Sequence, residues 1–380
     1  MKNWKVILVL IMFAILLSSV VPAGATDTLT RKLDAIYRDI RIFIDGEEII
    51  PTDVNGKIVE PFIIDGTTYV PLRAIGEAFG KHVEWVGENS TILINSQRET
   101  WDKPEHQDAP PAPSKKVTVS TPQELANAIA PDTCITLNAG VYDLSIIAKT
   151  ENQYVQAGNV AAALIVSDVE GLTLQAASGA KVEVVSPDRF SEVIMFTLCN
   201  GIKISGIEAG HTVTGEYECD AGVVLFDESA NINVEDCLLY GSGAVGISLR
   251  SCVSAQIDNT TVTDCSLRAV DIWLSNDITF NDCKFIKNRA YGSVIWGSYS
   301  SVAFFDCEIS GNRSLLWSAV EFNNDVLFER CKFKDNALLE GAEPVFKGQG
   351  IRLRDCEIEK AGFSGYWESG VIDSGGNKLK

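Results

Sequence analysis

The octet Ile278-Thr-Phe-Asn-Asp-Cys-Lys-Phe285 decides the fold, because five related octets accompany it at a nearly constant interval. All six have apolar residues at their first, third and eighth positions and Cys or Thr at the sixth. The octets begin at Ile232, Ala255, Ile278, Val302, Val326 and Ile351, which are 23 to 25 residues apart. A period of this length is typical of a solenoid, in which each coil buries its apolar side against its neighbours.

Each repeat predicts three short strands. In the copy that begins at Ile278, alternating apolar positions indicate one strand before the polar corner and a second after it. A turn over residues 286–291 leads to a third strand over residues 293–296, in which alternation places Ser293 and Ile295 inside and Val294 and Trp296 outside. Within the repeats, helices are excluded, because the 3.6-residue period of an amphipathic helix is missing.

Two columns of equivalent residues follow if the repeats stack in register. The corner column is polar, as a repeated left-handed bend requires, and consists of Asp236, Asn259, Asp282, Asp306, Arg330 and Asp355. The next column consists of Cys237, Thr260, Cys283, Cys307, Cys331 and Cys356. Thiols in one file along a solenoid cannot close a tetrahedron around a metal, so this column is interpreted as core packing.

This pattern resembles the right-handed parallel β-helix of the pectate lyase superfold, over residues 117–375. The resemblance implies a mainly β fold with three-strand rungs. It leaves the activity open, because the superfold serves many functions. Residues 120–129, with Thr121 as a cap before Pro122, predict a helix that closes the first end of the solenoid.

The chain begins with features of a secretory signal peptide over residues 1–25: two lysines, an apolar run and Ala23-Gly24-Ala25 as a cleavage site. We therefore expect a secreted or cell-surface protein with no membrane span after cleavage. Loss of Lys2 and Lys5 changes the formal charge from −19 to −21. Such an acidic chain disfavours nucleic acid as a partner, and also anionic polysaccharide unless a basic patch or a cation offsets the field.

Residues 40–95 predict a separate small α+β domain. Its evidence is a strand over residues 41–45, an Asp65-Gly66 hairpin turn, the run Tyr69-Val-Pro-Leu-Arg73 before a short helix, and Trp85 in a later strand. These residues resemble the copper amine oxidase-like N-terminal (stalk) domain of exported proteins of Gram-positive bacteria. That resemblance implies an accessory or wall-associated module, and no copper site, since His82 is the domain's only histidine. Residues 96–116 contain four prolines and predict a semi-rigid linker.

The outward side of the third strand is the candidate binding face. It is expected to present Arg250, Asp271, Trp273, Trp296 and Glu321, with Arg268, Arg289, Tyr291 and Arg313 in the adjoining turns. Aromatic faces flanked by polar groups suit sugar rings. The alternative is that the turns themselves cover the two tryptophans.

Catalysis on the same face is the second hypothesis. Arg250, Asp271 and Glu321 are the candidate acid–base residues, together with His211 from an insertion over residues 210–221. That insertion also holds Glu216, Tyr217, Glu218, Cys219 and Asp220, so a metal cluster or a self-contained loop remains open. Asp271 and Glu321 would lie two rungs apart, about 9.6 Å, at the wide edge of the spacing in inverting glycosidases.

The resemblance also raises a lyase, whose relatives use clustered Asp for calcium. That cluster is not matched here, so we expect no cofactor and no metal, and calcium stays an alternative without a carboxylate cluster to support it. The sequence thus favours a monomeric protein that binds polysaccharide or cell-wall glycan through this face. The alternatives are a polysaccharide lyase or hydrolase, and a structural or adhesive surface protein.

Overall fold

The computed structural model describes two compact units, one within the first hundred residues and one in the rest of the chain. The described residues are 34–44, 47–52, 57–79, 81–86, 91–96, 113–158, 161–188, 190–213, 221–241, 244–314, 317–323, 325–341, 343–360 and 362–380. The expected signal peptide lies outside them. Within them, no helix is long and apolar enough to cross a membrane.

Among its described residues, the first unit contains three antiparallel strand pairs and one helix, which include the expected hairpin at Asp65-Gly66 and the short helix after it. The pairs are β1 (Ile42–Ile44) with β2 (Glu47–Ile49), β3 (Phe62–Ile64) with β4 (Thr67–Tyr69), and β5 (Lys81–Val86) with β6 (Thr91–Ser96); the helix is α2 (Leu72–Ala78). Asp65 and Gly66, with φ of 49° and 79°, make the expected turn between β3 and β4.

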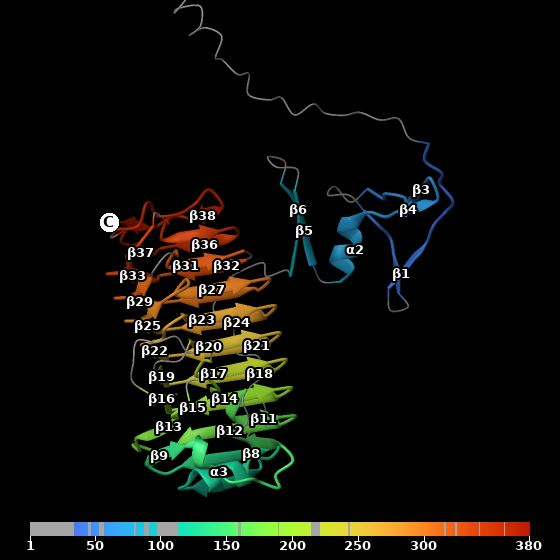
Figure 1. The fold of residues 1–380 in the computed structure, drawn as a ribbon. Helices are drawn as coiled ribbons and strands as arrows, with labels where there is room; N and C mark the ends of the chain where they lie inside the picture. Colours follow the sequence, from blue (N-terminus) through green and yellow to red (C-terminus); the bar gives the residue numbers. More distant parts are fainter. Residues whose placement is uncertain are drawn as a thin grey trace, which may run out of the picture. The chain divides into compact units, whose positions relative to one another are not determined.

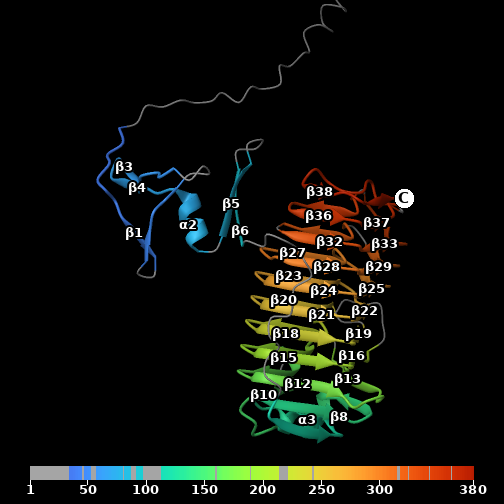
Figure 2. The same cartoon turned by 180° about the vertical axis from the view of Figure 1, so that it is seen from behind.

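The second unit is a parallel β-helix built from three long sheets (Figures 1 and 2). We number the sheets in the order in which a rung visits them. The first sheet contains, from its N-terminal edge, β7 (Lys115–Val119), β8 (Thr133–Leu137), β12 (Glu170–Ala176), β15 (Asn200–Ser205), β18 (Ala230–Glu235), β21 (Val253–Asp258), β24 (Asn276–Asn281), β28 (Val302–Phe305), β32 (Val326–Glu329), β36 (Ile351–Arg354) and β38 (Val371–Asp373).

The second sheet contains β9 (Gly140–Asp143), β13 (Val182–Ser186), β16 (Glu208–His211), β19 (Leu238–Tyr240), β22 (Thr261–Thr263), β25 (Lys284–Ile286), β29 (Glu308–Ser310), β33 (Lys332–Lys334), β37 (Glu357–Ile358) and β39 (Lys378–Leu379). The third contains β10 (Val155–Ala157), β11 (Ala162–Ser167), β14 (Glu192–Thr197), β17 (Val224–Asp227), β20 (Val245–Arg250), β23 (Arg268–Trp273), β27 (Ile295–Ser298), β31 (Val320–Phe322) and β35 (Phe346–Gly348). A lateral three-stranded sheet, β26 (Arg289–Ala290), β30 (Arg313–Ser314) and β34 (Ala337–Leu338), joins the turns that precede the third sheet.

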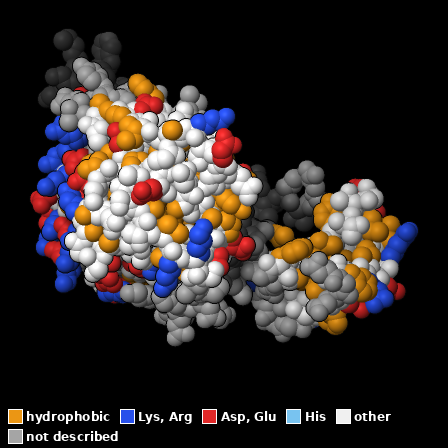
Figure 3. Space-filling view, turned by 90° about the horizontal axis from the view of Figure 1, so that it is seen from below, with side chains coloured by type: hydrophobic (Ala, Val, Ile, Leu, Met, Phe, Trp, Pro, Cys, Tyr) orange, Lys and Arg blue, Asp and Glu red, His pale blue; other side chains and the backbone are white. Residues whose placement is uncertain are grey.

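The predicted helix closes the first end of the solenoid as α3 (Pro122–Ala128), followed by the short 3-10 helix η1 (Leu144–Ile146). Thr121 caps α3 by accepting a hydrogen bond from the Glu124 N–H, and Leu125 and Ala126 are buried. Figure 3 views the molecule from this end and shows basic and acidic side chains mixed along one flank of the β-helix. That flank is the second sheet, where Lys284, Glu308, Lys332, Glu357 and Lys378 occupy matching positions in successive strands.

The corner column adopts the left-handed backbone predicted for it. The values of φ are 54° at Asp236, 43° at Asn259, 52° at Asp282, 57° at Asp306, 54° at Arg330 and 54° at Asp355. The side chains also bond along the column: Asn259 Nδ2 donates to Asp236 Oδ1 at 2.6 Å, and Arg330 spans both oxygens of Asp306 at 2.8 and 2.9 Å. This second contact lets an Arg replace Asn or Asp at a bend that disfavours it.

The cysteine column is core, also as predicted. Its five thiols are 0–4% exposed, and each lies within hydrogen-bonding distance of a carbonyl of the preceding rung, as in Cys283 Sγ to Ile257 O at 3.3 Å. Burial raises the pKa of Cys237 to about 11, so this thiol stays protonated at neutral pH. Among the described residues, no group of three or more His, Cys, Asp or Glu could hold a metal ion.

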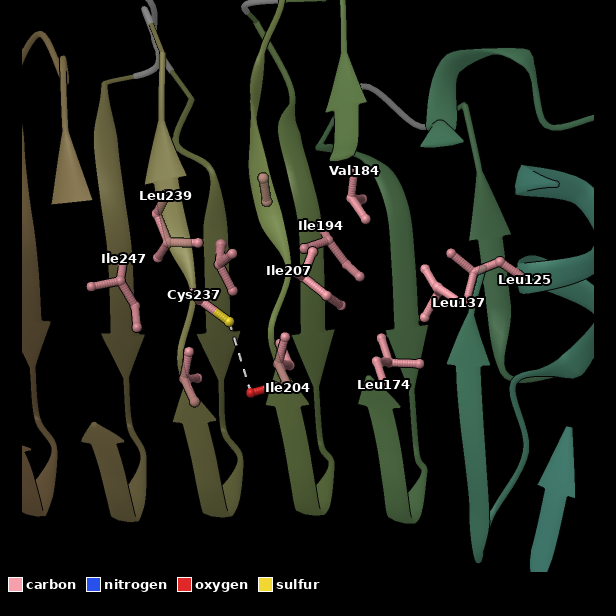
Figure 4. Close-up of a pocket in the computed structure, with 13 residues that line it drawn as sticks. Leu125, Leu137, Leu174, Val184, Ile194, Ile204, Ile207, Cys237, Leu239 and Ile247 are labelled. Atoms are coloured by element: carbon pink, nitrogen blue, oxygen red, sulfur yellow. Dashed lines mark hydrogen bonds between the residues drawn. The ribbon is translucent and has the colours of Figure 1, made fainter. Parts of the chain in front are cut away.

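The interior changes character along the axis. One inward column of the first sheet runs Leu174, Ile204, Val234, Ile257 and then Phe280, Phe304, Phe328. The three phenylalanines stack with ring centroids 4.7 and 4.5 Å apart and planes within 7° of parallel. The aliphatic half instead encloses a cavity of about 30 Å³ whose lining includes Ile204, Ala209 and Cys237 (Figure 4).

Candidate functional site

The outward positions of the third sheet form two adjacent columns. Strand register places Ser248, Asp271, Trp296, Glu321 and Lys347 in one column. The other contains Asp227, Arg250, Trp273 and Ser298. The structure therefore brings together Arg250, Asp271, Trp273, Trp296 and Glu321, with Asp271 and Glu321 two rungs apart as expected.

The two tryptophans are not equivalent. The Arg268 guanidinium lies 4.8 Å from the centroid of the Trp296 ring and also donates from Nη1 to Asp271 Oδ2 at 3.1 Å. Arg268 also passes Gly292, where a Cβ would lie in ordinary van der Waals contact with Arg268 Nε, at 3.4 Å. One face of Trp296 is therefore occupied by the protein itself, whereas Trp273 is 45% exposed.

Asp271 is partly withdrawn from water within this network. Burial raises the pKa of its carboxyl, and the positive charges of Arg268 and Arg250 oppose that shift. The Arg268–Asp271 ion pair is partly buried on both sides, with side-chain exposures of 23% and 16%. This pair fixes the orientation of Arg268 over Trp296.

One expected orientation is wrong. Val294 is 1% exposed and belongs to the core, whereas Ser293 Oγ donates to Glu321 Oε2 at 3.0 Å on the outward side. The regular alternation fails here because the N–H groups of both Ala269 and Val270 bond to the Val294 carbonyl, at 2.8 and 3.2 Å. Two residues of one strand therefore lie opposite a single residue of the next, as in a β-bulge, and the alternation of inward and outward side chains shifts by one residue.

Glu192, at the start of β14, was not identified from the sequence. It is 9% exposed, and burial raises its pKa to about 7, with smaller opposing contributions from the Gly222 N–H and Arg250. Its Oε2 is buried without a hydrogen-bond partner in the described part of the chain, and a Cβ at Gly222 would lie only 2.8 Å from that oxygen. Arg268 Nε, at the start of β23, and Ser318 Oγ, before β31, are also buried without a hydrogen-bond partner among the described residues. No sequence signal marked Glu192, because a charged residue at the start of a strand is normally solvated.

His211 is not an outward residue of the third sheet, but it contacts the segment that leads into β14. It ends β16 in the second sheet, is 3% exposed, and its Nε2 is 3.0 Å from the Ser191 carbonyl oxygen. This placement fits a histidine that supports the loop rather than one open to solvent. The other candidates of the insertion, residues 216–220, lie outside the described part of the chain.

Both rims of the face carry exposed aromatic or basic side chains. On the lateral-sheet side, Arg289 is exposed, Tyr291 is 42% exposed, and the Arg313 guanidinium donates to the Asp335 carbonyl at 2.8 Å. On the other side, Leu274 and Tyr299 follow β23 and β27 directly and are 44% and 65% exposed. Their φ values of 50° and 52° are unusual for bulky residues. Leu274 and Tyr299 occupy the same corner position in successive repeats, and this shared position is the sequence signal that could have predicted them as part of the rim.

Two protein-family models match the chain. Residues 221–379 match the right handed beta helix region, and residues 43–106 match the copper amine oxidase N-terminal domain. A search of curated proteins returns no match.

Among solved structures, pectate lyase Pel9A is similar at 13% identity and a TM-score of 0.44, covering 70% of this chain and 80% of its own. A polygalacturonase from Erwinia carotovora ssp. carotovora has 9% identity and a TM-score of 0.39, covering 72% and 99%. PfbA, a surface adhesin of Streptococcus pneumoniae, has 9% identity and a TM-score of 0.37, covering 65% and 72%. Together with the family models, these similarities concern the fold.

Proposed function

We propose that this right-handed β-helix protein is exported and binds polysaccharide or cell-wall glycan, as a monomer, through the outward face of its third sheet. The observation that carries the proposal is Trp273, an indole 45% exposed at a strand position, with Arg250 beside it in the register. Exposed indole next to hydrogen-bonding groups suits the apolar face and the hydroxyl groups of a sugar ring. Leu274 and Tyr299 extend the apolar surface at the same rim.

Arg268, Asp271 and Trp296 have a supporting role in this proposal. Their ion pair and cation–π contact hold a rigid polar surface next to Trp273. A binding surface that is ordered before the ligand arrives loses less conformational entropy on binding. Arg289 and Tyr291, on the opposite rim, would contact longer chains.

Glycan-array binding with the full-length protein tests the proposal. Trp273→Ala should abolish binding, while Val141→Ala, which removes an apolar side chain 62% exposed on the second sheet, should leave it unchanged. If Trp273→Ala binds as the parent does, or if the parent binds no glycan, this proposal is wrong. Recovery of the protein from the culture medium with residue 26 or a neighbour as its first residue would test export.

A second candidate, a hydrolase or lyase on the same face, is favoured by one observation. Burial raises the pKa of Glu192 to about 7, and the Asp271 carboxylate adds to that shift, so the face contains two carboxyl groups in different environments. Glycosidases use such a pair as acid and as base or nucleophile. Reducing-sugar release that is lost in both Glu192→Gln and Asp271→Asn would support a hydrolase. Unsaturated uronides absorbing at about 235 nm would indicate a lyase.

A further inference from the structure

The lateral sheet carries basic side chains on its outer side. Arg289 in β26 and Arg313 in β30 are register partners in adjacent parallel strands, so their Cα atoms lie about 4.8 Å apart. Both residues are exposed, whereas Ala290 and Ser314, which follow them directly, are each 2% exposed. The two arginine side chains therefore leave the same outer face of the sheet, away from the core.

Lys287 adds a third cation. It is exposed two residues before Arg289, and Asn288 between them is buried, so alternation directs both basic side chains to the same side. Gly311 occupies the equivalent corner in the rung of Arg313, with φ of 66°, and a Cβ there would lie 3.8 Å from Lys287 Cγ. Because glycine has no side chain, that rung leaves the corner beside Lys287 uncovered. We call Lys287, Arg289 and Arg313 the basic cluster.

Arg313 is held in position by the backbone. Its Nη1 donates to the carbonyl oxygens of Asn312, at 3.1 Å, and of Asp335, at 2.8 Å. The Nε and Nη2 atoms of the same guanidinium donate to none of the described residues, so one edge of the group is available to a ligand. A guanidinium that is ordered before the ligand arrives loses less conformational entropy on binding.

The basic cluster is local, and its sign is opposite to that of the chain, whose formal charge is −19. Asp264 and Asp335 occupy the corner position of Lys287 one rung before it and two rungs after it, so the basic cluster spans only two rungs. Like charges in directly neighbouring positions destabilise a sheet. Three cations gathered in two rungs therefore indicate a compact anionic ligand that offsets their repulsion.

We propose that the basic cluster binds a sulfate or phosphate ester carried by the glycan, an inference that rests on the proposed function. A carboxylate offers two oxygens in one plane, and a single guanidinium pairs with both. Three separate cationic side chains instead match the three terminal oxygens of a sulfate or phosphate monoester. Tyr291 follows Arg289 on the same rim and is 42% exposed, so its ring is accessible to the sugar that carries the ester.

Retention of the full-length protein on modified dextrans, at about 0.15 M salt, tests the inference. The parent should be retained on dextran sulfate, on dextran phosphate or on both, and the arm that retains it identifies the ester. Carboxymethyl dextran of the same charge density should retain it much less. Equal retention on carboxymethyl dextran, or no retention on either ester, would overturn the proposal.

Two double variants with the same change in charge separate the basic cluster from general electrostatic attraction. Arg289→Gln/Arg313→Gln removes charge-assisted hydrogen bonds and should weaken retention on the esters at least about tenfold. Lys284→Gln/Lys332→Gln acts at exposed positions of the second sheet and should change it less than about twofold. Equal losses in the two double variants would show that net charge, rather than the basic cluster, holds the ester.

Lys287→Gln is a second variant that leaves the backbone contacts of Arg313 intact. It should weaken retention on the esters about two- to fivefold, and unchanged retention would contradict the proposal. Trp273→Ala should keep the preference for esters over carboxymethyl groups. If that preference is absent while glycan-array binding still requires Trp273, only this inference fails. If the preference is present and the array shows no binding, the proposed function fails instead.

Discussion

The two halves of the β-helix repeat the same backbone and fill it with different side chains. Up to Ile257, the inward column of the first sheet is aliphatic and borders a cavity of about 30 Å³. From Phe280 to Phe328, the same column is a stack of parallel phenylalanine rings, which Leu353 follows. The comparison shows that the coil depends on the period and the corners, while the volume of the core side chains varies along the axis.

The polar groups inside the two halves differ as well. At the turn after the second sheet, Asn288, Asn312 and Asn336 form a buried ladder in which each Oδ1 accepts from the backbone N–H of the preceding rung, at 2.9 and 3.2 Å for the last two. The corresponding residue one rung earlier is Cys265, whose N–H bonds to Asn288 Oδ1 at 3.0 Å. The candidate binding face lies where the aliphatic half of the core meets the phenylalanine half, since Trp273 belongs to the rung between Ile257 and Phe280.

The largest effect should come from breaking the phenylalanine stack. Phe304→Ala removes the middle ring from between Phe280 and Phe328 and should lower the free energy of unfolding by about 3–5 kcal/mol. Ile204→Ala, in the same column of the aliphatic half, should cost less, about 2–4 kcal/mol. Denaturant unfolding measures both, with Leu339→Ala, 56% exposed, as the control. Equal losses for Phe304 and Ile204 would contradict the distinction drawn here.

The next effect concerns two buried glutamates, one in each half. Glu192 Oε2 has no hydrogen-bond partner among the described residues, whereas Arg330 and Arg354 both pair with Glu329. Because the folded-state pKa of Glu192 is raised to about 7, its protonated form favours the fold below about pH 4.5, and this contribution is lost as the pH rises to 7. Glu192→Gln should therefore be more stable than the parent at pH 8, on the order of 2–3 kcal/mol, and similar at pH 4.

Unfolding of the parent and the variant across pH 4–8 tests this difference. Glu329→Gln serves as the control and should be destabilised at pH 8, because it leaves two arginines without their carboxylate. A parallel pH dependence in the parent and in Glu192→Gln would contradict the assigned protonation.

A smaller loss is expected from the asparagine ladder. Asn312→Ala removes an acceptor for the Asn288 N–H and a donor to the Phe285 carbonyl at 2.8 Å. Leaving these buried groups unpaired should cost about 1–3 kcal/mol. Leu339→Ala, 56% exposed, should stay within about 0.5 kcal/mol of the parent in the same unfolding measurement.

The smallest effect, and the only gain in the core, should come from filling the cavity. Ala209→Val adds two methyl groups next to the void, and about 24 cal/mol per Å³ over 30 Å³ predicts a gain of at most about 0.7 kcal/mol. The analogous Ala290→Val in the phenylalanine half, at a residue 2% exposed, should destabilise by overpacking. Stabilisation by both substitutions would show that the cores of the two halves are packed equally loosely.

The sequence by itself determined the parallel β-helix, the left-handed corners, the buried thiol column and the capping helix α3. Each depends on residues at fixed positions of a repeat, and stacking in register turns equal positions into neighbours. Strand alternation also predicted Trp273 and Asp271 on one outward face.

Only the tertiary structure decided which outward side chains remain open to solvent. The Arg268 guanidinium covers one face of Trp296. The irregular pairing at Val294 turns this side chain into the core and Ser293 toward the outside. Glu192 is buried beside Gly222. These outcomes depend on side-chain reach and on turns that differ between rungs, neither of which a periodic pattern contains. Repetition specifies the coil, whereas the chemistry of its surface depends on where the repetition is broken.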